Sequence, residues 1–113
     1  LDRKNDMLIS GGYNVYPREV EDVLLSFDGV IEAGVIGIPD EKWGDRIHAV
    51  VAGRSGLDSG AVLAWAKERL ADYKRPKAVE IWSELPKSAA NKVLRRKIRE
   101  IVTQRDRIKE PGA

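Results

Sequence analysis

The stretch around which the chain is organised lies near its end and reads Leu85-Pro86-Lys87-Ser88-Ala89-Ala90-Asn91-Lys92-Val93-Leu94-Arg95-Arg96. Pro86 donates no backbone hydrogen bond, and Ser88 and Asn91 are turn and cap formers, so the first half predicts a loop. From Val93 onward apolar residues recur at helical spacing, which predicts a helix. Lys92 is therefore expected at a loop-to-helix junction, where free N–H groups and the helix dipole favour an anion. The alternative interpretation is one surface lysine among many.

The composition describes one small globular domain. The chain has 113 residues, of which 34% are charged and 42% hydrophobic, and its net charge of +2 creates no strong field for nucleic acid. It contains no cysteine, and its one histidine, His48, cannot form a zinc site alone. No apolar run approaches the ~20 residues of a membrane span, so we expect a cytoplasmic protein. The chain opens at Leu1 without a methionine, and we expect it to be part of something longer.

The first third of the sequence predicts a linker, a hairpin and a helix. Residues 1–6 are charged and polar, and the short apolar runs 7–9 and 13–16 flank Gly11 and Gly12. The two glycines permit positive φ and close approach of another group, although taken alone they are better explained by an ordinary hairpin turn. Pro17 suits the first position of a helix, and Gly29 is expected to end that helix.

The rest of the pattern alternates strands and helices. Residues 30–38 and 46–53 read as strands around a turn-rich loop, 39–45, that carries Trp43. His48 lies in the second of these strands, where we expect no chemical duty. A helix capped by Asp58 or Ser59 is expected to run to about Asp72, followed by a strand over 78–82 and a helix that frays from about 104. The order predicts an α+β fold, with a small hairpin plus a three-stranded sheet and about three helices packed on it.

A basic cluster follows the second helix. Tyr73-Lys74-Arg75-Pro76-Lys77 places three cations beside an aromatic ring, a combination that can bind phosphates. The alternative is a solvated helix end, where cations suit the dipole in any case.

Two long motifs resemble those of the adenylate-forming enzymes, which include acyl- and aryl-CoA synthetases, peptide-synthetase adenylation domains and firefly-type luciferases. The first runs from Asp2 to Glu21 and includes Ser10-Gly11-Gly12-Tyr13; the second is Pro86-Lys87-Ser88 with Asn91-Lys92-Val93-Leu94-Arg95-Arg96. They are similar to the motifs that open and close the C-terminal domain of this family, and the resemblance covers Asp2 to about Val102. Their order and separation make the signal specific.

The resemblance implies a domain plan and a two-step reaction. Residues 1–6 would form the hinge to an N-terminal domain that is absent here, residues 7–103 the C-terminal domain, and residues 104–113 a flexible tail. The N-terminal domain would bind ATP, Mg²⁺ and a carboxylic acid to make acyl-AMP, after which the small domain rotates and the acyl group passes to CoA. The complete protein is then expected to be an acid–CoA ligase and this fragment alone to be inactive, with no metal site of its own.

The resemblance also assigns roles to individual residues. Lys92 matches the lysine that enters the active site during adenylation, Asn5 the hinge, and Arg3 a position near the nucleotide ribose. Ser10, Gly11 and Gly12 match the loop that lines the pantetheine tunnel. The positions implied to hold the nucleotide end of CoA are Trp43, Tyr73, Arg75 and Lys77.

One position departs from the family pattern, and two other functions remain open. Asn91 stands where many relatives have glycine, and because Asn tolerates left-handed φ we expect the loop to form. The runner-up function is the equivalent part of an adenylation domain that loads a carrier protein, which needs no clamp for CoA phosphates. The third is a small basic nucleic-acid module, which 18 interspersed acids and few aromatics disfavour. The sequence gives no information on which acid is activated, because that pocket would belong to the N-terminal domain.

Overall fold

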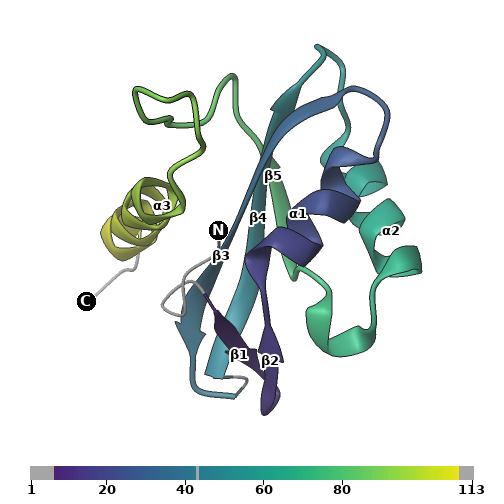
Figure 1. Ribbon diagram of the computed structural model, residues 1–113. Coiled ribbons are helices and arrows are strands. Elements are labelled where there is room, and N and C mark those ends of the chain that lie inside the picture. Colours follow the sequence, from purple (N-terminus) through teal and green to yellow (C-terminus); the bar gives the residue numbers. More distant parts are fainter. Residues whose placement is uncertain (1–6, 43, 110–113) are drawn as a thin grey trace.

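The computed structural model describes residues 7–42 and 44–109, and for residues 108 and 109 it describes the backbone alone. Its centre is a mixed five-stranded sheet with the strand order β2-β1-β4-β3, in which β5 also pairs with β4 (Figure 1). The strands are β1 (Leu8–Ser10), β2 (Tyr13–Val15), β3 (Val30–Asp40), β4 (Gly44–Gly53) and β5 (Ala78–Ile81). The helices are α1 (Pro17–Leu25), α2 (Ser59–Arg69), the short 3-10 helix η2 (Asp72–Lys74) and α3 (Arg95–Lys109).

Helices cover both faces of this sheet, as Figure 1 shows, with α1 and α2 on one face and α3 on the other. The period-two alternation of β4 supplies both interfaces, because Ala49 and Val51 belong to the core under α1 and α2 whereas Val50 belongs to the core under α3. Gly34 on β3 lies under α3, where an added Cβ would come within 2.4 Å of Ile98. The expected α+β architecture is confirmed, and the hairpin joins the main sheet at the register pair Ser10–Gly44, where Ile9 N–H also donates to the Asp45 carboxylate at 3.0 Å.

Several element boundaries differ from those expected. The helix α1 ends at Leu25 rather than at Gly29, because the N–H groups of Ser26 and Phe27 turn back to the carbonyls of Val23 and Leu24. Gly29, with φ of 100°, instead forms the entry to β3. The expected loop 39–45 is shorter, since β3 and β4 pair along their whole length up to Asp40 and Gly44.

The last helix begins and ends later than expected. It starts at Arg95, because Val93 is used in an isolated β-bridge with Lys87. It then stays helical to Lys109, beyond the expected fraying point at residue 104. Arg105 explains this extension, since it forms two 2.7 Å hydrogen bonds with the Glu80 carboxylate on β5. The helix α2, in contrast, ends at Arg69, three residues before Asp72.

Candidate functional site

Lys92 lies on a tight turn directly before α3, and its side chain is exposed. The turn is closed by a 2.8 Å bond from Ser88 N–H to the Lys92 carbonyl, and the Ser88 hydroxyl accepts from the Lys92 N–H at 3.3 Å. Asn91 has φ of 65°, which confirms that asparagine supplies the left-handed conformation here. The expected junction is therefore present, with Lys92 three residues before the first residue of the helix.

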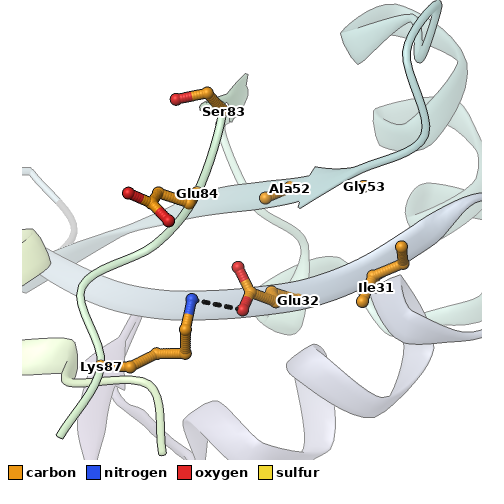
Figure 2. Close-up of a pocket in the computed structure, with 7 residues that line it drawn as sticks. All are labelled: Ile31, Glu32, Ala52, Gly53, Ser83, Glu84 and Lys87. Carbon is orange, nitrogen blue, oxygen red and sulfur yellow. Dashed lines mark ion pairs between the residues drawn. The ribbon is translucent and has the colours of Figure 1, made fainter. Parts of the chain in front are cut away.

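An ion pair fixes the entry to this turn. The Lys87 Nζ lies 2.5 Å from the Glu32 carboxylate on β3, and both side chains are 22% exposed. The hydrogen bond from Lys87 lowers the pKa of the Glu32 carboxyl; burial opposes this shift and a hydrogen bond from Leu85 N–H adds to it. Figure 2 shows this pair between the turn and β3. The two residues line a hollow of about 240 Å³, whose other lining residues are Ile31, Ala52, Gly53, Ser83 and Glu84.

A second ion pair fixes the exit from the turn. Arg95, the first residue of α3, donates two 2.7 Å hydrogen bonds to the carboxylate of Glu21 on α1. The Glu21 carboxylate is almost fully buried and also accepts from the Val35 N–H of β3 at 2.9 Å. Because β3 is an edge strand of the sheet, this carboxylate satisfies a backbone donor that no strand pairs with. The pair thereby connects elements on opposite faces of the sheet.

The predicted CoA-facing residues begin at the β1–β2 hairpin. Ser10 is buried at the pairing with Gly44, whereas Gly11 and Gly12 are exposed at the tip with φ of 58° and 87°. An added Cβ at Gly12 would meet no atom within 4 Å. The glycines thus satisfy the backbone of the turn and leave space next to it for another molecule.

The basic cluster lies against this hairpin. Tyr73 stacks on Tyr13, with ring centroids 4.5 Å apart, and Lys74 pairs with Glu19 at 2.6 Å. That hydrogen bond raises the pKa of Lys74. Arg75 donates to the Leu70 carbonyl and lies 2.7 Å from the Asp72 carboxylate. The structure therefore brings Tyr73 and the hairpin together, while Arg75 is already engaged within the domain.

The two groups of predicted residues lie at different ends of the sheet. The hairpin adjoins β4 at Gly44, whereas the hollow beside the Lys92 turn is lined by residues of the other end of β4, Ala52 and Gly53. At about 3.3 Å per residue, the separation along the strand is on the order of 20 Å or more. One approaching molecule would have to span that distance to contact both groups. The predicted positions Arg3, Asn5 and Trp43 fall outside the described residues.

Sequence reasoning missed the acids that hold these elements. Glu21 lies on the same buried stripe as Val20 and Leu24, and an acid in an apolar helical stripe is a signal of a buried partner. His48 is buried as well, with Nε2 2.6 Å from Glu80. Within the part of the chain that the structure describes, no three His, Cys, Asp or Glu side chains gather as a metal site requires. Among residues 7–42 and 44–109, no helix has the length and apolar character to cross a bilayer.

Comparison with known proteins gives consistent matches. The sequence model of one protein family, the AMP-binding enzyme C-terminal domain, matches residues 19–92. The 2-succinylbenzoate–CoA ligases of Bacillus cereus and Bacillus licheniformis are 44% and 49% identical to the chain, over 92% and 87% of its length. The chain spans only 22% and 20% of those two relatives.

Solved structures show the same fold. A Mycobacterium tuberculosis fatty acyl CoA synthetase aligns with a TM-score of 0.84 and 40% identity, over 92% of this chain and 21% of that one. The o-succinylbenzoate CoA synthetase of Bacillus subtilis, solved with its acyl-adenylate intermediate, aligns with a TM-score of 0.79 and 47% identity, over 87% and 20%. The similarity extends across almost the whole chain and concerns about a fifth of each relative.

Proposed function

The chain belongs to the family of AMP-binding enzyme C-terminal domains, and we propose that it is the mobile C-terminal domain of an acyl-CoA ligase. The observation that carries this proposal is that the base of the Lys92 turn and the Gly12 hairpin lie at different ends of β4, since Lys87 pairs with Glu32, which is opposite Ala52, whereas the hairpin pairs with Gly44. A domain with two separate working surfaces suits two successive half-reactions, because each step then uses one orientation of the domain. The names of its relatives, which are CoA ligases and a CoA synthetase, support the same reaction class.

The first half-reaction joins a carboxylic acid to AMP. The acid's carboxylate attacks the α-phosphorus of ATP, the bond to the β-phosphate breaks, and acyl-AMP and pyrophosphate form; Mg²⁺ and the ATP site belong to the N-terminal domain. The Lys92 ammonium would neutralise charge where two anions approach each other, which is worth most in a site from which water is excluded. A turn that holds its backbone in one conformation suits that task.

The second half-reaction transfers the acyl group to a thiol. The CoA sulfur attacks the acyl carbon, AMP leaves, and a thioester forms, with the thiol proton passing to solvent or a base of the large domain. The exposed backbone at Gly11 and Gly12 would let the pantetheine arm pass closely, and Tyr73, Arg75 and Lys77 would lie near its nucleotide end. In the complete protein Arg3, Asn5 and Trp43 keep their proposed roles at the ribose, the hinge and the CoA nucleotide.

The test separates the two steps in the full-length protein. With ATP, Mg²⁺ and a panel of carboxylic acids, one acid should give pyrophosphate and bound acyl-AMP without CoA, and added CoA should release AMP and thioester. The purified 113-residue chain should give no AMP above background with the same reagents. AMP formation by that chain alone, or no pyrophosphate release by the full protein with any acid, would contradict the proposal.

The second candidate is an adenylation domain that loads a carrier protein. The internal engagement of Arg75 with Leu70 and Asp72 favours it, because this arginine is less available to CoA phosphates than its sequence position implies. The discriminating measurement is the rate of thioester formation with CoA, dephospho-CoA and pantetheine. Free CoA should be preferred if the ligase assignment is right, and equal rates with all three favour the carrier-protein assignment.

A further inference from the structure

The turn that carries Lys92 is attached to the domain at both ends by ion pairs to which the family resemblance assigns no role. On the entry side, Lys87 pairs with Glu32 of β3, and on the exit side Arg95 forms a bidentate pair with Glu21 of α1. The β-bridge between Lys87 and Val93 closes the base between them. Both carboxylates are supported by backbone donors, since Glu32 accepts from Leu85 N–H and Glu21 from Val35 N–H.

Burial makes these pairs selective for one arrangement. The Glu21 side chain is 8% exposed and the Arg95 side chain 20%, so the ions have lost most of their water and depend on each other's geometry. Arginine provides a planar fork that fixes direction as well as distance. The strand and helix that carry the acids are packed into the core that α1 shares with the sheet, so the acids form a rigid reference for the turn.

We propose that Lys87–Glu32 and Arg95–Glu21 are positioning pairs that fix the Lys92 turn for the adenylation step. This inference rests on the proposed function, because Lys92 is taken as the residue that enters the adenylation site. Lys87 and Arg95 act through the backbone of the turn. The Ser88 hydroxyl, which accepts from the Lys92 N–H, links the fixed start of the turn to Lys92.

The opposite end of α3 offers a matched control. Arg105 forms a bidentate pair with Glu80 at the same 2.7 Å distances, but it lies ten residues beyond Arg95 and holds the helix to β5. Arg105→Met therefore removes the same chemical contact from the same helix without touching the turn. If Lys87 and Arg95 only stabilise the fold, removing either of their ion pairs should have the same effect as Arg105→Met.

The experiment compares variants of the full-length protein in three measurements: the adenylation rate, the thioester rate from supplied acyl-AMP, and hydrogen exchange of the amides of residues 88–94. Lys87→Met should slow adenylation by about 10- to 100-fold, as small misplacements of catalytic groups do, and speed turn exchange about tenfold, while the thioester rate stays within about twofold. Lys87→Arg should restore adenylation. Glu21→Gln/Arg95→Met, in which Gln keeps an acceptor for Val35 N–H, should behave like Lys87→Met and guards against misfolding from an unpaired Glu21.

The remaining outcomes all decide the question. Unchanged turn exchange in Lys87→Met, normal adenylation despite faster exchange, or an equal loss in Arg105→Met would each overturn the positioning role. Lys92→Ala distinguishes this from failure of the proposed function. If Lys92→Ala adenylates normally, the proposed role of Lys92 is wrong and so is the inference. If Lys92→Ala adenylates slowly while Lys87→Met adenylates normally, only the inference is wrong.

Discussion

The Lys92 turn and the Gly12 hairpin differ in how much support each receives from the domain. The turn is closed by its own hydrogen bonds, held by two ion pairs at its base, and packed through Leu85 and Val93 against the core under α3. The hairpin consists of two three-residue strands that are held at their base, where Ser10 pairs with Gly44, Ile9 N–H donates to Asp45, and Leu8 and Val15 lie in the core under α1 and α2. Its tip has exposed glycines, next to Tyr13, which is 59% exposed.

This difference corresponds to what each region would present to a partner. A side-chain cation acts over a short distance and loses its effect when displaced by an ångström, so its backbone has to be fixed. A backbone that lines a passage for another molecule has to lack bulky side chains more than it has to be rigid, and glycine has no side chain. The proposed two-step reaction therefore predicts that changes in the two regions harm different half-reactions.

The largest effect is expected from Lys92→Ala in the full-length protein. Loss of an ammonium that stabilises developing charge should slow acyl-AMP formation by roughly 10²- to 10³-fold. Thioester formation from supplied acyl-AMP should be nearly normal, since the proposed rotation would by then have turned Lys92 away from the active site. Pyrophosphate release and single-turnover thioester formation measure the two steps. The control is Lys97→Ala, which removes an exposed lysine from the first turns of α3. Equal damage to both half-reactions would remove the distinction between the two regions.

The next effect is expected from Gly12→Leu, measured on the thioester step with both CoA and pantetheine. A Cβ added at Gly12 meets no atom within 4 Å, so harm beyond backbone strain is expected to come from blocking a partner. Gly56 is a matched control, because it also has positive φ, 89° against 87°, and open space around its Cβ. Both leucine variants should lose about 1–2 kcal/mol of stability, as left-handed backbone costs a side chain. Only Gly12→Leu should slow the thioester step, by about tenfold or more; a similar loss in Gly56→Leu would attribute the effect to strain.

Local chemistry predicted most of the elements and the glycine turn. The β-branched runs, Pro17 at a helix start and the Asp58 cap each depend on neighbouring residues, and the Asp58 carboxylate does accept from Ala61 N–H. Asn91 was predictable for the same reason, since its tolerance of left-handed φ is its own property. The helix limits were harder to predict. The hydrogen bond from Ser26 N–H to the Val23 carbonyl sets the end of α1, and the β-bridge between Lys87 and Val93 sets the start of α3.

The ion pairs were not predictable, because they depend on distant parts of the chain. Glu21 and Arg95 are 74 residues apart, and their contact requires the sheet to place α1 and the start of α3 around one strand edge. Residue roles near CoA were predicted from position, and the structure adds that Arg75 has internal partners that compete for its guanidinium. A one-dimensional pattern identifies a cation and leaves its partner undetermined.

A smaller effect is expected from Arg75→Ala/Lys77→Ala on the KM for CoA. Charge-assisted contacts with phosphate contribute about 1.5–3 kcal/mol each when well made and less when exposed, so about tenfold is expected in the KM for CoA. Adenylation should be unchanged, and added salt should reproduce part of the loss. The matched control is Lys67→Ala/Arg99→Ala, which removes two exposed cations from α2 and α3. An unchanged KM for CoA would mean that this side of the hairpin makes no clamp, and the carrier-protein assignment would then be preferred.

The smallest effect on activity is expected from Glu80→Gln, which alters the far end of α3 and neither working region. Arg105 chiefly lowers the pKa of Glu80, which is about 2 in the folded chain against 4.5 ordinarily; hydrogen bonds from Trp82 and His48 add to this, and burial opposes it. A carboxyl with a lowered pKa stabilises the fold above pH 4.5 and loses that contribution as the pH falls toward 2. The shift corresponds to a contribution of at most about 3 kcal/mol to the free energy of unfolding, and solvent at the 38% exposed Arg105 side chain reduces that contribution. Urea unfolding of the 113-residue chain should therefore show wild-type stability falling between pH 5 and pH 2, in the range that these pKa values set.

In Glu80→Gln that fall should be shallower, because a group that gains a proton on unfolding is gone, while Glu32, whose pKa Lys87 lowers in the same direction, still contributes. The control Glu68→Gln makes the same change of charge at an exposed carboxylate of α2. In the full-length protein at neutral pH, Glu80→Gln should be less stable yet adenylate within about twofold of wild type, because the Lys92 turn is held at the other end of α3. A large loss of adenylation would show that the whole of α3, rather than the two pairs at its start, determines where Lys92 lies.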